Sequence, residues 1–168
     1  MNATRTTIAA SLLLACAAAG SAGAADVIRY PLPGGSTFPI ASAVEVPAGK
    51  ATVYVSGMTP AVADPKAAPN TFAAYGDTRT QALSALNSIK ATLERVHLTM
   101  GDVVKMQVFL VGDPAKGGRM DFDGLMAAYT QFFGTKEQPN LPARSAMQVA
   151  ALANPGFLVE IEVVAARP

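Results

Sequence analysis

Two charged side chains near the end of the chain, Arg144 and Glu160, stand out because each interrupts a largely apolar segment. Residues 143–152 and 157–165 alternate in the manner of β-strands, and an Asn-Pro-Gly turn at 154–156 separates them. If these strands are neighbours, the guanidinium and the carboxylate converge at one edge of a sheet. Such a pair is either the polar centre of a site or an ordinary ion pair on a half-exposed sheet face, and spacing alone leaves both interpretations open.

A second candidate for contact with a ligand is the pair Ser56 and Gly57. It ends a segment, residues 51–56, whose β-branched and aromatic residues predict a strand. Gly57 has no Cβ, so it permits either a tight turn or a close approach of the backbone to a ligand. A plain turn at the end of a strand explains the same residues equally well.

The remaining elements follow from periodicity. Apolar residues recur at three- and four-residue steps over 77–97 and 121–133, which predicts two amphipathic helices. Alternation predicts further strands at 39–46 and 102–111. The order strand, strand, helix, strand, helix, strand, strand predicts an α+β fold, in which two helices pack on one face of a mixed β-sheet and the other face needs a cover.

Two segments are expected to lack regular structure. Residues 26–37 are rich in Pro and Gly, so we expect an extended and partly mobile lead-in. Residues 59–75 contain three prolines and predict a long loop that covers part of the molecule.

The composition limits what the chain can do. Of its 168 residues 51% are hydrophobic and only 15% are charged, which predicts one folded domain over 26–168 rather than a disordered chain. The formal net charge is +1 and there is no basic stripe, so we expect no binding of nucleic acid or of an anionic membrane surface. The chain has one Cys and one His, and no cluster of the two that would predict a metal site.

Residues 1–25 have the pattern of a secretory signal peptide. Arg5 precedes an apolar run of Ala and Leu that is too short to span a membrane, and small residues follow it. We expect cleavage after position 24 or 25 and export to the periplasm, with secretion as an alternative. Residues 13–16 loosely resemble a lipoprotein box, so anchoring of the chain through a lipid on Cys16 is the second interpretation.

Several short motifs together resemble one family. The segments 142–145 (Pro-Ala-Arg-Ser) and 159–162 (Val-Glu-Ile-Glu) resemble the C-terminal signature of the RidA/YjgF family, the enamine and imine deaminases. Ser56-Gly57, the segment 101–105, and Tyr129 with Phe132-Phe133 resemble the same family. The resemblance implies a chorismate-mutase-like fold and a homotrimer, in which three subunits bury their sheets against one another and ligand clefts lie between subunits.

The resemblance also implies roles for individual residues. Arg144 would hold the carboxylate of a 2-imino acid, for which its planar fork of donors is suited. Glu160 would position or activate the water that adds to the C=N carbon. The backbone near Ala146 would add hydrogen bonds to the carboxylate, and Ser56 and Gly57 would border the substrate. The products would be a 2-oxo acid and ammonia, and no cofactor would be needed.

The chain departs from the family pattern at three places. Ala146 stands where active members have Cys, Met126 stands where they often have Asn, and residues 39–42 lack the expected Gly-Pro-Tyr. Two functions therefore remain in competition: an exported imine deaminase, and a non-catalytic module that binds a small carboxylate in the same cleft. RNA cleavage, attributed to some relatives, is disfavoured by the neutral charge and the predicted leader.

Overall fold

The computed structural model describes residues 25–168, so the predicted leader and Cys16 lie outside the described residues, apart from Ala25 at the leader's end. The strands are β1 (Ile28–Tyr30), β2 (Ala43–Glu45), β3 (Thr52–Met58), β4 (Val103–Val111), β5 (Ala143–Val149) and β6 (Val159–Ala166). The α-helices are α1 (Phe72–Tyr75), α2 (Thr78–Arg95) and α3 (Phe122–Tyr129), and three short 3-10 turns are η1 (Pro33–Gly35), η2 (Met100–Asp102) and η3 (Pro114–Lys116).

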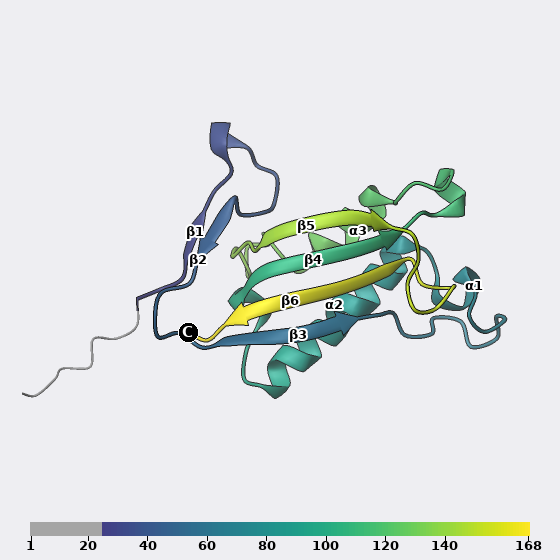
Figure 1. Cartoon of the computed structure of the whole chain (residues 1–168), viewed down its shortest axis with the longest axis horizontal. Coiled ribbons are helices and arrows are strands. Elements are labelled where there is room, and N and C mark those ends of the chain that lie inside the picture. The colour runs from purple at the N-terminus through teal and green to yellow at the C-terminus, as the bar shows by residue number, and fades with distance from the viewer. Residues whose placement is uncertain (1–24) are drawn as a thin grey trace, which may run out of the picture.

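A four-stranded sheet with the order β3-β6-β4-β5 forms the centre of the molecule. Strands β4 and β5 are parallel, whereas β6 is antiparallel to both β3 and β4. The two long helices, α2 and α3, lie together behind the sheet in Figure 1. The structure therefore confirms the predicted α+β fold, a mixed sheet with two helices on one face.

The two C-terminal strands are not neighbours. Strand β4 lies between β5 and β6 and pairs with both, so the expected hairpin is wrong. Alternation identifies strands but does not say which strands pair. The connection of residues 150–158 crosses over the end of β4, and β4 is the strand best suited to the interior because buried residues alternate with half-buried ones along its whole length.

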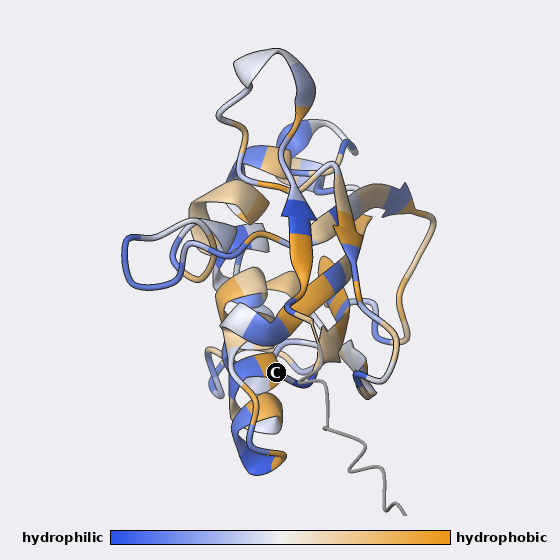
Figure 2. Cartoon of the chain, turned by 90° about the vertical axis from the view of Figure 1, so that its left-hand side faces the viewer, coloured by the Kyte–Doolittle hydropathy of each residue, from blue (hydrophilic) through white to orange (hydrophobic). Residues whose placement is uncertain are grey.

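The helices bury their apolar stripes against the sheet. Helix α2 begins at Thr78 because the Asp77 carboxylate accepts a hydrogen bond from the Thr80 N–H at 2.8 Å. Its core side is fully buried and consists of Ala82, Ala85, Leu86, Ile89 and Leu93. Helix α3 ends at Tyr129, before the predicted residue 133, because the chain tightens there: the N–H groups of Phe132 and Phe133 both bond to the Tyr129 carbonyl. Figure 2 shows the hydrophobic colour concentrated in the sheet and on the helix sides that face it.

The N-terminal segment is more ordered than its composition predicts. Residues 28–30 form β1, which pairs with β2 in a separate two-stranded sheet beside the start of β5 (Figure 1). The guanidinium of Arg29 donates hydrogen bonds to the carbonyls of Gly101 (2.9 Å), Val103 (2.9 Å) and Leu141 (2.8 Å). One side chain thus ties this small sheet to both β4 and the segment that leads into β5.

The long loop after β3 is held down by hydrogen bonds. It contains α1, and the N–H groups of Ala63 and Asp64 donate to the Ala74 carbonyl at 2.7 and 3.0 Å. The Asn154 side chain donates to Asn70 and to Tyr75, so the loop also packs on the connection between β5 and β6. Within residues 25–168, no helix has the length and apolar character needed to cross a membrane.

Candidate functional site

Arg144 lies on the helix side of the sheet, in an aromatic environment. It sits opposite Met106 of β4, whose side chain is fully buried under the helices. Its guanidinium carbon is 4.4 Å from the ring centroid of Tyr129. The ring centroids of Phe38 and Phe122 are 5.5 and 5.6 Å away. These distances are typical of cation–π contacts, which hold the guanidinium in a fixed place.

The guanidinium of Arg144 has no acidic partner among residues 25–168. The one hydrogen bond found for it there runs from Nη1 to the Sδ of Met126 at 3.2 Å, and a thioether is a weak acceptor. Burial lowers the pKa of Arg144, but an arginine remains charged at any working pH. A half-buried cation with several free donors is therefore prepared to receive an anion.

The ring beneath this cation is neutral. Burial raises the pKa of the Tyr129 hydroxyl well above its usual range, and the same hydroxyl donates a hydrogen bond to the Pro39 carbonyl at 2.8 Å. Tyr129 thus stays protonated and cannot serve as the counter-ion of Arg144.

Ala146 lies on the same face of β5 as Arg144, and β5 is an edge strand. The Ala41 N–H bonds to the Pro142 carbonyl at 3.0 Å, which shows that even-numbered residues here direct their backbone groups away from β4. Because backbone groups alternate along a strand, the N–H of Ala146 points to the free edge. We call Arg144 and Ala146 together the Arg half-site: a cation next to a free backbone donor.

Glu160 lies on the opposite face, which α2 and α3 leave uncovered. It sits opposite Phe109 of β4. Strand β3 shifts register between Val55 and Met58, and this irregularity brings Gly57 against the Glu160 side chain. A Cβ at Gly57 would collide with the Glu160 carboxylate, so the backbone at Gly57 lies directly against this acid. Ser56 is exposed on β3 beside them. Ser56, Gly57 and Glu160 form what we call the Glu half-site.

Within one chain the two half-sites do not meet. Their partners on β4, Met106 and Phe109, are three residues apart, so Arg144 and Glu160 project from opposite faces of the sheet. They are also two strands apart, or about 10 Å in the direction of pairing. The expectation that these two side chains converge at one edge within the chain is therefore wrong, because β4 separates the strands that carry them.

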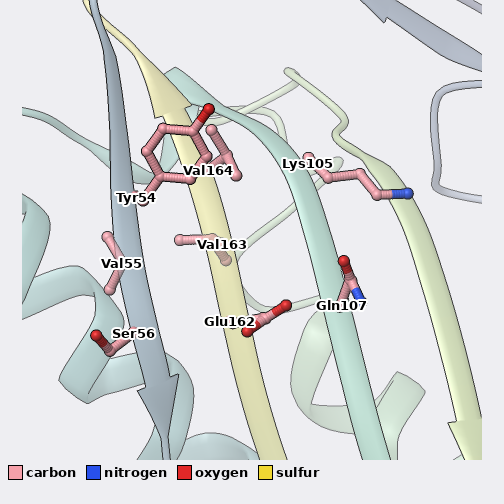
Figure 3. Close-up of a pocket in the computed structure, with 8 residues that line it drawn as sticks. All are labelled: Tyr54, Val55, Ser56, Lys105, Gln107, Glu162, Val163 and Val164. Atoms are coloured by element: carbon pink, nitrogen blue, oxygen red, sulfur yellow. The ribbon is translucent and has the colours of Figure 1, made fainter.

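The uncovered sheet face has a hollow of its own, close to the Glu half-site. Its volume is about 210 Å³ and Figure 3 shows its lining: Tyr54, Val55, Ser56, Lys105, Gln107, Glu162, Val163 and Val164. The Lys105 ammonium is 3.5 Å from the Ser145 hydroxyl. Sequence reasoning did not single out Gln107 or Tyr54, although the period-two alternation of polar and apolar residues places them on this face.

The residues around Arg144 were also missed as a group. The apolar stripe of 121–133 predicted core packing for Phe122 and Tyr129, and no role was predicted for Phe38. Only the contact distances show that they surround a cation. Among residues 25–168, no three His, Cys, Asp or Glu side chains lie close enough together to hold a metal ion.

Comparison with known proteins finds one family. The family model described as Endoribonuclease L-PSP matches residues 35–167. The 2-iminobutanoate/2-iminopropanoate deaminase of Salmonella typhimurium is 36% identical over 115 residues, which cover 68% of this chain and 79% of that protein. A RutC family protein of Haemophilus influenzae is 37% identical over 99 residues, which cover 59% of this chain and 71% of that protein.

A solved structure agrees with these matches. The structure of Escherichia coli TdcF with bound serine aligns with a TM-score of 0.54 and 31% identity, over 83% of this chain and 94% of that one. The TdcF sequence of Escherichia coli, 34% identical over 115 residues, carries the name "Putative reactive intermediate deaminase TdcF".

The contrast between two arginines gives a test of the site. Arg29 has three carbonyl acceptors, so Arg29→Met should lower the free energy of unfolding by about 2 kcal/mol. Arg144 has no oxygen acceptor within residues 25–168, so Arg144→Met should change the free energy of unfolding by less than about 1 kcal/mol. Urea unfolding at a fixed protein concentration measures both. If Arg144→Met lowered the free energy of unfolding as much as Arg29→Met does, Arg144 would be a structural residue and the interpretation of it as a ligand-binding residue would be contradicted.

Proposed function

Because the chain belongs to the RidA/YjgF family, we propose that it hydrolyses 2-imino and enamine acids to 2-oxo acids and ammonia without a cofactor. One observation carries the proposal: the Arg144 guanidinium is held against Tyr129 at 4.4 Å with no acid beside it in residues 25–168. An arginine kept only for stability would have carbonyl or carboxylate partners, as Arg29 has.

The complete site requires a second subunit. The Arg half-site is at the β5 edge, and the Glu half-site is on the uncovered face of β3 and β6. That face also exposes large apolar side chains, with Tyr54 79% and Met147 37% exposed, and an apolar sheet face needs a cover. We propose that a homotrimer provides it, and that the β5 edge of one subunit faces the Glu half-site of the next.

The chemistry follows from the two half-sites. Arg144 holds the substrate carboxylate through two parallel hydrogen bonds, and the Ala146 N–H adds a third. This contact fixes the C=N carbon in front of Glu160 of the adjacent subunit. The Glu160 carboxylate accepts a proton from water as the water oxygen bonds to that carbon, and the same proton then passes from Glu160 to the imine nitrogen. The resulting carbinolamine loses ammonia and leaves the 2-oxo acid.

A binding module without catalysis is the competing function. Ala146 and Met126 replace polar or thiol side chains expected in active members, and residues 39–42 carry no Tyr. Such a module would be stabilised by small carboxylates without converting any of them. The family model is described as an endoribonuclease, but a net charge of +1 gives RNA little electrostatic attraction.

Export remains a proposal that rests on residues 1–25 alone. An exported enzyme would act on imines formed outside the cytoplasm, for example by amino-acid dehydrogenases. Mass spectrometry of the protein recovered from the periplasm tests this: loss of 24 or 25 residues supports cleavage, a lipidated Cys16 supports anchoring, and a full-length cytoplasmic chain contradicts export.

Imine hydrolysis by the purified protein tests the proposed activity. Imines are generated in situ from several amino acids by an amino-acid oxidase, and release of the 2-oxo acid is followed. The wild type should accelerate release, and Arg144→Ala should reduce the acceleration by about a hundredfold or more, because the carboxylate loses its charged donors.

Arg95→Ala is the matched control, since Arg95 is exposed at the end of α2 and the one side-chain hydrogen bond found for it within residues 25–168 goes to Thr92 of the same helix. Both variants should keep the oligomeric state of the wild type. Unchanged turnover in Arg144→Ala would contradict the proposal. No acceleration by a well-folded wild type would favour the binding module.

A further inference from the structure

The contacts found for the Arg144 guanidinium are with three aromatic side chains and one thioether. We call Phe38, Phe122, Met126 and Tyr129 the Arg144 cage. Three of them present aromatic rings within 5.6 Å of the guanidinium carbon, and the fourth contributes a thioether at 3.2 Å from Nη1. None carries a charge, because burial keeps the hydroxyl of Tyr129 protonated.

Phe38 is the exposed wall of this cage. It lies in the connection between η1 and β2, and its ring stacks on Phe122 with centroids 6.3 Å apart. Its side chain is nevertheless 39% exposed. Phe38 also borders a hollow of about 300 Å³, whose lining combines apolar side chains such as Ile40 with polar ones such as Asn140.

The position of the carboxylate determines where the rest of a ligand lies. A carboxylate on the free donors of Arg144 sits about 3 Å from the guanidinium nitrogens. Within this subunit, the accessible surface nearest to the carbon chain of the same small molecule is formed by the Phe38 ring and the Met126 thioether. An apolar substituent gains by leaving water there, whereas a charged or polar one loses its hydration and finds no partner in the cage.

We propose that the site selects 2-imino acids with large apolar or aromatic side chains over small or charged ones, and that Phe38 is the residue that determines this preference. The inference rests on the proposed function, since it assumes that Arg144 holds the substrate carboxylate. The preferred substrates are the imines that correspond to leucine, methionine and phenylalanine. The disfavoured ones correspond to alanine and glutamate.

Binding of the stable 2-oxo acid products tests the preference separately from turnover. Calorimetry measures Kd for 4-methyl-2-oxopentanoate, pyruvate and 2-oxoglutarate with the wild type, Phe38→Ala and Ile28→Ala. Ile28 is the matched control, because it lies in β1 of the same N-terminal segment and its side chain is likewise partly exposed, at 46%. The wild type should bind 4-methyl-2-oxopentanoate about tenfold or more tightly than pyruvate, and Phe38→Ala should remove most of that ratio. Ile28→Ala should keep it.

Each outcome separates the two proposals. Equal affinities in the wild type would overturn the preference, and a ratio that survives Phe38→Ala would overturn the role of Phe38, even if imines are hydrolysed. A preference without turnover of any imine would overturn the deaminase and leave the preference standing. Failure of every 2-oxo acid to bind, in a protein that also hydrolyses no imine, would overturn both. If Phe38→Ala does not fold, Phe38→Leu is measured, and it should lower the ratio for the larger 4-phenyl-2-oxobutanoate.

Discussion

Strand β4 is the constraint on which the arrangement of the site depends. It pairs with β5 on one side and with β6 on the other, and its pairing register determines to which face of the sheet each residue of those two strands points. Arg144 pairs with Met106 and Glu160 pairs with Phe109, three positions further along β4. Because side chains alternate between the two faces of a sheet, Arg144 and Glu160 point to opposite faces. No rotamer change can bring the two side chains together across a fully packed sheet. A site that uses both must therefore be completed by another copy of the chain.

Arg144 shows how a fold can hold a charge ready for a ligand. The rings that surround it supply cation–π attraction and exclude water, but they supply no oxygen acceptor. The N–H donors of Arg144 are therefore free to bind a ligand. Burial removes water from the guanidinium and lowers its pKa, but the group stays charged. Arg29 represents the opposite use of the same residue type. Its guanidinium donates to three backbone carbonyls, and these hydrogen bonds join the small N-terminal sheet to the central four-stranded sheet.

The parts of the structure that were predictable from sequence are those governed by periodicity. The stripe of α2 and the alternation in β3, β4 and β6 identified their elements, because burial on one face leaves a direct pattern. The order of the strands left no such pattern, so an apparent hairpin proved to be two strands separated by β4. The role of Phe38 was equally hidden, since it depends on contacts between segments more than eighty residues apart in sequence.

The central claim is that Arg144 and Glu160 act together from different subunits, and complementation of two inactive variants tests it most directly. Arg144→Ala and Glu160→Gln are unfolded together, refolded as a mixture and assayed for imine hydrolysis. In randomly mixed trimers roughly a quarter of the clefts would combine an intact Arg144 with an intact Glu160, so activity should return to roughly a quarter of the wild-type value. Arg144→Ala mixed with the double variant should stay inactive. Mixed trimers that remain inactive would contradict the account.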